Sequence, residues 1–172
     1  ENSLTENSFI STNMTASNFL NGFSSWFTGP EYRHLGRKIL LKAQELNKQA
    51  DGGNKSVLDE YFVLSEMIPI YYRDREKDGM LDKAIEACKK QILLAPQAKE
   101  TFLKEYPWQV LPSHQGYEQL VIILDKQGKT GKAIALSKQA KEEGWSGDWS
   151  SRIERYSKKL RENAENKLEA RL

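Results

Sequence analysis

The clearest candidate for chemistry in this sequence is residues 120–133, LVIILDKQGKTGKA, in which an apolar run precedes glycines and lysines. A phosphate-binding loop needs a glycine, any four residues and then Gly-Lys-Ser/Thr, because backbone amides, the lysine and the hydroxyl together hold phosphate and magnesium. The GKT at 128–130 supplies the second half of this pattern, but Ile123 stands where the first glycine belongs. The second register, GKA at 131–133, lacks the hydroxyl. The stretch therefore predicts no nucleotide site.

The other reactive side chains are few and widely separated. His34 and His114 lie in different parts of the chain, without the neighbouring histidine or cysteine that metal ligation requires. The single cysteine, Cys88, lies in an apolar helical pattern, where a thiol acts as a small hydrophobic group. Carboxylates occur in mixed charged runs such as KEE at 141–143, which solvation explains. We therefore expect no catalytic, metal or cofactor site, a chain that is not an enzyme, and histidines that cap helices or lie at the surface.

Charge and hydropathy narrow the class of partner. The chain has 26 basic and 24 acidic residues interspersed over 172 positions, so no single-sign field would attract nucleic acid or anionic lipid. The YYRDR at 71–75 is a small aromatic and basic cluster that could stack on bases, which is the weaker alternative. No apolar run approaches the length of a membrane span. We expect a cytoplasmic protein that recognises another protein or peptide by shape and takes no small-molecule substrate.

Helical periodicity surrounds the opening stretch. Apolar or small residues recur at spacings of one and three on each side of the glycines, which is typical of the buried face of an amphipathic helix. The LVIIL run is therefore predicted to be a helix face followed by a turn, and the pattern favours an all-α fold. The first helix carries Tyr117, Leu120, Val121 and Leu124, and the second carries Ala133, Ile134, Ser137 and Ala140.

These two helices resemble one tetratricopeptide repeat, whose pattern is W-x2-L-G-x2-Y, a turn, A-x3-F-x2-A and a later proline. The residues of the first helix fall on first-helix positions, Gly128 on the turn, and the residues of the second helix on second-helix positions. Val121 replaces the glycine of the pattern, Ser137 replaces the aromatic residue, and Trp145 replaces the proline. The resemblance implies antiparallel helix pairs with small alanines where the two helices approach.

A second copy lies upstream, as the resemblance requires, since a single helix pair cannot bury its own apolar face. Pro69 should bend its first helix, because proline removes one backbone hydrogen bond. Residues 96–114 make the spacing between the two copies longer than a regular repeat, and they are expected to form a short helix and a connector. We therefore predict an all-α, irregular α-solenoid of antiparallel helix pairs. The second copy consists of Leu64, Met67, Ile68 and Tyr71, the turn residue Gly79, then Ala84 and Cys88, and the terminal Pro96.

The flanking segments are predicted to be a loose N-terminal segment and a C-terminal capping helix. Residues 1–30 are rich in Asn, Ser and Thr at first, so we expect disorder or loose packing, and they end in a short aromatic helix face within residues 19–27. We expect this face to pack over the first helices; binding of a partner or a membrane surface is the alternative. Residues 31–172 are assigned to the repeat-like helical domain, with a helix from 31 to about 50, a capping signature at Ser56 and Asp59, and a terminal helix with one apolar face.

The predicted function is that of a non-enzymatic module that binds a peptide or helix of a partner protein in a groove. The resemblance places this groove on first-helix residues between the packing positions: Phe62, Glu66, Tyr72 and Arg73 in one copy, and Gln115, Glu118, Gln119 and Ile122 in the other. Chaperone-binding members of the family hold a C-terminal carboxylate with lysines and asparagines, which the corresponding positions here lack. The alternative is an accessory or regulatory subunit that forms a fixed helical homo-oligomer through the face from Trp149 to Leu168.

Overall fold

The computed structural model describes residues 15–50 and 56–169, and its regular structure there is helical apart from one isolated bridge between Ser113 and Ser146. The expected all-α class is confirmed. Residues 1–14 lie outside the described residues, so the predicted looseness stays a prediction for them. The α-helices are α1 (Ala16–Ser24), α2 (Arg33–Gln49), α3 (Val57–Arg73), α4 (Met80–Glu105), α5 (Gln115–Lys126), α6 (Thr130–Glu143) and α7 (Trp149–Glu169), and a 3-10 turn, Ser25–Phe27, follows α1.

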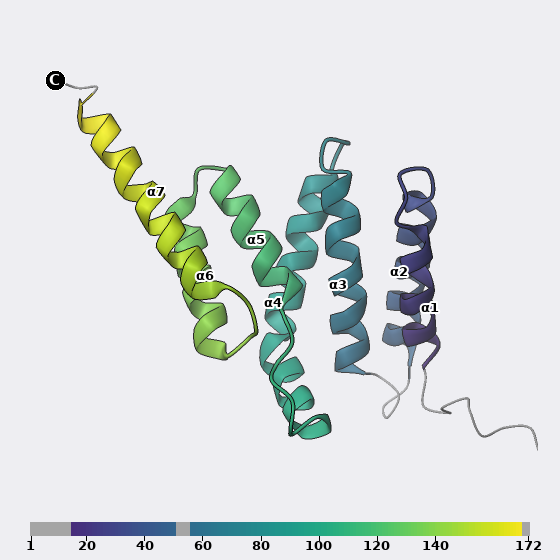
Figure 1. The fold of residues 1–172 in the computed structure, drawn as a ribbon. Coiled ribbons are helices and arrows are strands. Elements are labelled where there is room, and N and C mark those ends of the chain that lie inside the picture. The colour runs from purple at the N-terminus through teal and green to yellow at the C-terminus, as the bar shows by residue number, and fades with distance from the viewer. Residues whose placement is uncertain (1–14, 51–55, 170–172) are drawn as a thin grey trace, which may run out of the picture.

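The helices stand side by side in chain order (Figure 1). Each helix packs against the next one along the chain, and α3 also contacts α1 and α5. The helices α1, α3 and α5 therefore share one layer, with α2 and α4 behind them in the view of Figure 1. The C-terminal part of α7 extends beyond the other helices.

Local sequence sets the helix ends and turns. Ser56 caps α3, because its hydroxyl accepts a hydrogen bond of 3.1 Å from the Asp59 amide, as the capping signature predicts. Gly79 and Gly128, both predicted turn residues, have φ angles of 66° and 73°. These values lie in the left-handed region that glycine adopts without strain, so Gly79 caps the start of α4 and Gly128 forms the turn between α5 and α6.

The opening stretch of the sequence analysis is a helix followed by a turn. Residues 120–126 lie in α5, so the apolar run is a helix face and not a strand. Lys129 is exposed, and its ammonium donates to Gln127 Oε1 at 2.9 Å. The Thr130 hydroxyl donates to Asp125 Oδ1 at 3.0 Å. Both side chains that would serve a phosphate loop are therefore engaged in local hydrogen bonds.

Pro96 corrects the sequence prediction for the middle of the chain. The sequence predicts that a helix ends near Pro96, yet α4 continues through it as one helix of 26 residues. Ala95, Ala98 and Phe102 are all buried on the same side of α4. Their burial offsets the one hydrogen bond that proline cannot donate. The predicted short helix after Pro96 is thus the second half of α4.

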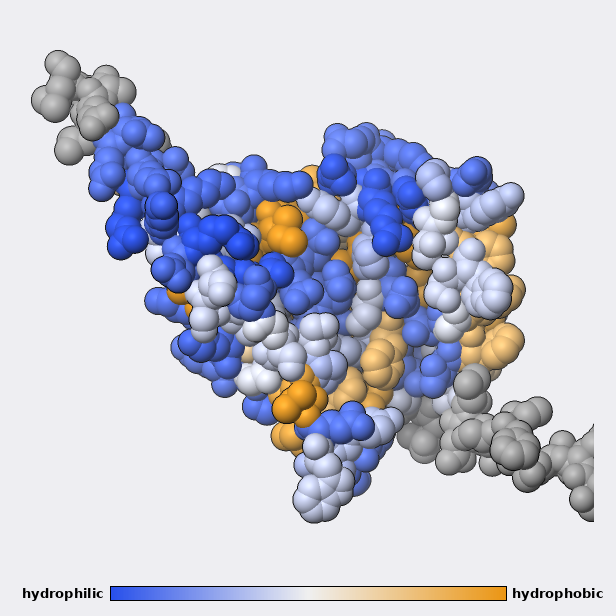
Figure 2. All heavy atoms as spheres, in the orientation of Figure 1, coloured by the Kyte–Doolittle hydropathy of each residue, from blue (hydrophilic) through white to orange (hydrophobic). Residues whose placement is uncertain are grey.

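The N-terminal helix packs on α2 and α3, as expected, but much of its aromatic face points outward. Its buried residues are the small Ser17 and Ser24, and Leu20 packs against the core. Phe19, Phe23 and Trp26 are 59%, 44% and 82% exposed, so the expectation that this face packs inward is wrong for these three residues. Small side chains allow close helix packing and leave the aromatic side chains outside. Figure 2 shows hydrophobic colour along this edge of the molecule.

A buried amide joins the three middle helices. Gln91 of α4 is fully buried; its Nε2 donates to the Tyr61 carbonyl of α3 at 3.0 Å, and its Oε1 accepts from the Gly116 amide of α5 at 2.6 Å. A Cβ on Gly116 would lie 2.9 Å from the Cys88 carbonyl oxygen, so glycine is what lets α5 approach α4 this closely. Cys88 is itself fully buried, as predicted, and burial raises the pKa of its thiol to about 12.

His114 caps α5 from inside the core. Its Nδ1 accepts a hydrogen bond of 3.3 Å from the Tyr117 amide, which confirms the capping role and leaves Nε2 as the protonated nitrogen. That nitrogen is buried without a hydrogen-bond partner. The rings of Tyr61 and Trp145 lie nearly perpendicular to the imidazole, with centroids at 5.3 and 4.7 Å, so the imidazole is enclosed by aromatic side chains. Burial lowers the pKa of His114 to about 4.

We expect the free energy of unfolding to fall as the pH is lowered from 6.5 toward about 4, because the pKa of His114 is lower in the folded chain than in the unfolded chain. The loss approaches roughly 3 kcal/mol at the acid end of this window. Urea unfolding at several pH values measures the slope. His114→Asn keeps a capping side chain and should remove most of the slope, whereas the exposed His34→Asn should retain it. An unchanged slope in His114→Asn would contradict burial of a neutral imidazole.

Candidate functional site

The helices α3 and α5 lie beside one another and run in the same direction. Near their N-terminal ends, the Tyr61 hydroxyl donates to the Ser113 carbonyl at 3.1 Å, across 52 positions of sequence. Near their C-terminal ends, the Lys126 ammonium lies 5.6 Å from the centre of the Tyr72 ring. The two contacts fix the register, so successive turns of α3 and α5 lie at matching levels.

This register brings most of the predicted site residues onto one surface, which we call the α3–α5 face. The side chains that stay exposed or half-buried recur once per turn on each helix, as expected for the outward side of a packed helix. Pro69 belongs to this set although the sequence analysis did not include it. The α3–α5 face consists of Phe62, Glu66, Pro69 and Arg73 on α3 and Gln115, Glu118 and Ile122 on α5.

Gln119 is a correction to the predicted set. It is 7% exposed, and its amide nitrogen is buried without a hydrogen-bond partner. It precedes Ile123 by one helical turn, and Ile123 lines a hollow together with Tyr72 of α3. Residues four apart share a side of a helix, so Gln119 faces the contact between α3 and α5 and not the outer surface.

An apolar hollow lies at the N-terminal end of the α3–α5 face. It has a volume of about 260 Å³ and is lined by Phe62, Phe102 and Tyr106 together with residues 109–112 of the α4–α5 connector. Val110 on its wall is 85% exposed, and Trp108 in the same connector is 96% exposed. The sequence analysis treated this segment only as a connector. Its apolar composition, YPWQV, was the one signal that could have marked it as a surface for binding.

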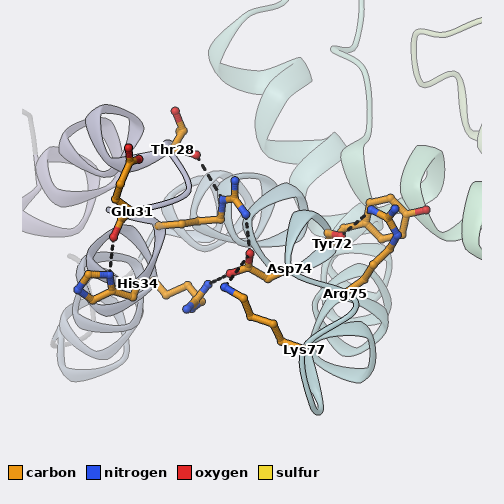
Figure 3. A network of polar contacts seen from close by, with 9 residues as sticks. Thr28, Glu31, His34, Tyr72, Asp74, Arg75 and Lys77 are labelled. Carbon is orange, nitrogen blue, oxygen red and sulfur yellow. Dashed lines mark hydrogen bonds and ion pairs between the residues drawn. The ribbon is translucent and has the colours of Figure 1, made fainter.

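A second hollow lies at the C-terminal end of the same two helices. It has a volume of about 250 Å³, and its lining includes Tyr72, Leu81 and Ile123 with the cations Arg75 and Lys126. The Arg75 guanidinium lies 4.8 Å from the centre of the Tyr72 ring, as Figure 3 shows from close by. Tyr72 is therefore half-buried at the end of the face, and its hydroxyl is buried without a hydrogen-bond partner.

Two half-buried carboxylates lie at the same level of the α3–α5 face. Neither Glu66 nor Glu118 forms an ion pair with any residue in the described ranges. Burial raises the pKa of both carboxyls, although Arg73 acts against this at Glu66 and Arg152 acts against it at Glu118. An unpaired, partly desolvated carboxylate destabilises a fold, so Glu66 and Glu118 each lower the stability of the chain.

The charges at the C-terminal end of α3 have a structural role and lie apart from the face. The buried Asp74 carboxylate pairs with Arg33 and Arg37 of α2 and with Lys77 (Figure 3). Burial alone would raise the pKa of Asp74, but hydrogen bonds from Arg37, Arg33 and Lys77 hold it below its ordinary value. Arg33 and Arg37 fasten α2 to the end of α3, and Lys77 pairs with Asp74 from the following loop, so none of the three is free to bind a partner's carboxylate.

We expect the double substitution Glu66→Gln and Glu118→Gln to raise the thermal midpoint at pH 7. Both folded-state pKa values are raised, so ionisation of these groups weakens the fold as pH rises above their unfolded values, near 4.5. The gain should therefore shrink as the pH is lowered from 7 toward 4.5. Glu86→Gln is the matched control, since Glu86 is exposed and pairs with Lys90 at 2.6 Å, and it should not stabilise. A lower midpoint in the double variant would mean that these carboxylates are paired.

Tyr72→Phe should raise the free energy of unfolding by about 1 kcal/mol, because it removes a buried hydroxyl that has no hydrogen-bond partner and keeps the ring. Urea unfolding measures the change. Tyr32→Phe provides the control, since Tyr32 is 56% exposed and its hydroxyl is free to bind water. If Tyr72→Phe destabilises the chain while Tyr32→Phe does not, the Tyr72 hydroxyl is hydrogen-bonded in solution.

Within the described ranges, none of the helices combines the length and the apolar character needed to cross a bilayer. The same ranges bring no three histidine, cysteine, aspartate or glutamate side chains together as a set of metal ligands. No protein-family model, curated protein or solved structure matches the chain. We therefore infer a function from the geometry and chemistry of the α3–α5 face itself.

Proposed function

We propose that this chain is a non-enzymatic interaction module that binds a segment of another protein across the α3–α5 face. The observation that carries the proposal is the parallel register of α3 and α5. It sets Phe62, Glu66 and Arg73 beside Gln115, Glu118 and Ile122 on one open surface with an apolar hollow at its end. A surface that combines aromatic, aliphatic and arginine side chains has the composition of binding hot spots.

The packing of the two helix pairs supports a relation to tetratricopeptide repeats. In the two repeat-like copies, Leu64 corresponds to Tyr117 and Ile68 to Val121, so equivalent residues are 53 positions apart (117 − 64 and 121 − 68). The hydrogen bond from Tyr61 to Ser113 joins residues 52 positions apart, which is nearly the same separation. Small buried residues lie where the resemblance expects the paired helices to approach, at Ala84 in α4 and at Ala133 and Ala140 in α6. In such an arrangement the first helix of each pair lines the binding groove, which is where α3 and α5 lie.

The alternative, a fixed homo-oligomer formed through α7, has less support from the side chains. Trp149 and Tyr156, which begin the predicted apolar face, are buried within the chain. Leu160 is 45% exposed, and the residues from 161 to 166 are polar or small and exposed. Leu160 is thus the one large apolar side chain that is exposed on α7 up to residue 166, Ile153 is half-buried, and Leu168 lies outside the described side chains. Light scattering of the purified chain distinguishes a monomer from an obligate oligomer.

Ile122→Asp should abolish capture of a natural partner from an extract of the source cells. A charge at the centre of a desolvated contact costs about 2 kcal/mol or more, which is roughly a thirtyfold loss of affinity. Leu93→Asp is the matched control, because Leu93 is 79% exposed on α4 and lies outside the α3–α5 face. Circular dichroism should show the same helical signal in both variants. If the Ile122→Asp variant captures the partner as well as the unchanged chain does, the partner binds on another surface.

A further inference from the structure

The two ends of the α3–α5 face differ in charge as well as in shape. At the N-terminal end, the apolar hollow beside Phe62 lies one helical turn from Glu66, and Glu118 lies at the same level on α5. Arg152, the cation that acts on Glu118, is already paired with Asp148. This end therefore offers an apolar hollow next to two carboxylates that form no ion pair within the described ranges.

The C-terminal end of the face is basic. Arg73 is exposed, Lys126 lies against the Tyr72 ring, and neither forms an ion pair among the described residues. Asp125, next to Lys126, is paired with Lys159 at 2.8 Å, so it does not neutralise Lys126. Arg75 adds a third cation beside the same hollow, although it is paired with Glu76 at 3.2 Å. A carboxylate placed at this end would meet Arg73 and Lys126, which form no ion pair in the described ranges, although Glu76 also lines the hollow and Arg73 interacts with Glu66.

The alternation of apolar and charged levels along the face favours an extended ligand over a helical one. A helix docks through a continuous apolar stripe, which would bury Glu66 and Glu118 without partners. An extended segment instead sends successive side chains to different places, so it can fill the apolar hollow and pair with the carboxylates separately. The face therefore suits a segment in which apolar and charged residues follow one another.

Resting on the proposed function, we infer that the α3–α5 face binds an extended peptide segment of another protein that carries three features in order. The first is an aromatic or branched aliphatic side chain for the hollow at Phe62. The second is a lysine or arginine for Glu66 and Glu118. The third is an aspartate or glutamate for Arg73 and Lys126. This order follows the charge of the face from its acidic to its basic end. The ligand can run from N-terminus to C-terminus along the face or in the opposite direction.

The helix geometry of α3 sets the spacing between these features. Phe62 and Glu66 are one turn apart, about 6 Å, and Glu66 and Arg73 are two turns apart, about 10 Å, at 1.5 Å of rise per residue. An extended chain advances about 3.3 Å per residue. The basic residue of the ligand should therefore lie about two positions from the apolar anchor, and the acidic residue about two or four positions further, because only alternate side chains of an extended chain point toward the face.

A library of displayed random peptides of about eight residues, long enough to span the face, tests the inference. The library is selected on the full chain and counter-selected on the Ile122→Asp variant. We expect enrichment of an apolar residue, a basic residue and an acidic residue at the stated spacing. Enrichment of the reversed charge order, of a helical spacing or of no charge pattern overturns the inference, and so does an absence of enriched peptides.

Synthetic copies of an enriched peptide then test each contact by fluorescence anisotropy. Glu66→Gln with Glu118→Gln should weaken binding at least tenfold, and replacing the basic residue of the peptide by glutamine should add little further loss in that variant. Glu86→Gln is the control and should leave affinity unchanged. Independent, additive losses would overturn the pairing. If peptides fail while the natural partner is still captured through Ile122, the inferred ligand is wrong and the proposed function stands; if capture also survives Ile122→Asp, both fail.

Discussion

The buried amide of Gln91 is the constraint on which the arrangement of the middle helices depends. It donates to α3 and accepts from α5 while it belongs to α4, so one side chain fixes the relative positions of three helices. Because a buried amide without partners is costly, any slip of α3 against α5 would lose these bonds. The register that aligns Glu66 with Glu118 follows from this bond pattern. The face on the outside is thus set by a polar contact on the inside.

Polar groups without partners occur in the core as well as on the α3–α5 face, since His114 Nε2 and the Gln119 amide nitrogen are also buried without partners. Gln91 has partners for both ends of its amide, whereas Glu66, Glu118 and the Tyr72 hydroxyl lack partners in the described ranges. A sequence selected only for stability would pair or remove such groups. Local violations of this kind concentrate where a protein binds or reacts, because the missing partner is supplied by a ligand. On the α3–α5 face, where a ligand can reach them, the unpaired carboxylates of Glu66 and Glu118 support the proposed binding role.

Short-range pattern was enough to predict the helices, the glycine turns and the caps, because each depends on residues within a few positions. Helical periodicity also separated outward from packed positions on α3 and α5, and six of the eight predicted residues lie on the α3–α5 face. Gln119, the course of α4 through Pro96 and the outward aromatic stripe of α1 were not predictable. Each depends on which neighbouring element packs against the helix. Periodicity alone does not say which face of a helix that neighbour covers. The hollow beside Trp108 was missed because a connector has no periodicity to read.

The chain-order packing of the helices has a consequence for how the molecule gains and loses structure. Because each helix contacts mainly its neighbours along the chain, few contacts require distant segments to meet, and folding is correspondingly fast. Such an array also opens from its ends, since a terminal helix has a neighbour on one side only. Amide hydrogens of α3, α4 and α5 should then exchange most slowly, with protection falling toward α1 and α7. The binding face would persist while either end of the array frays.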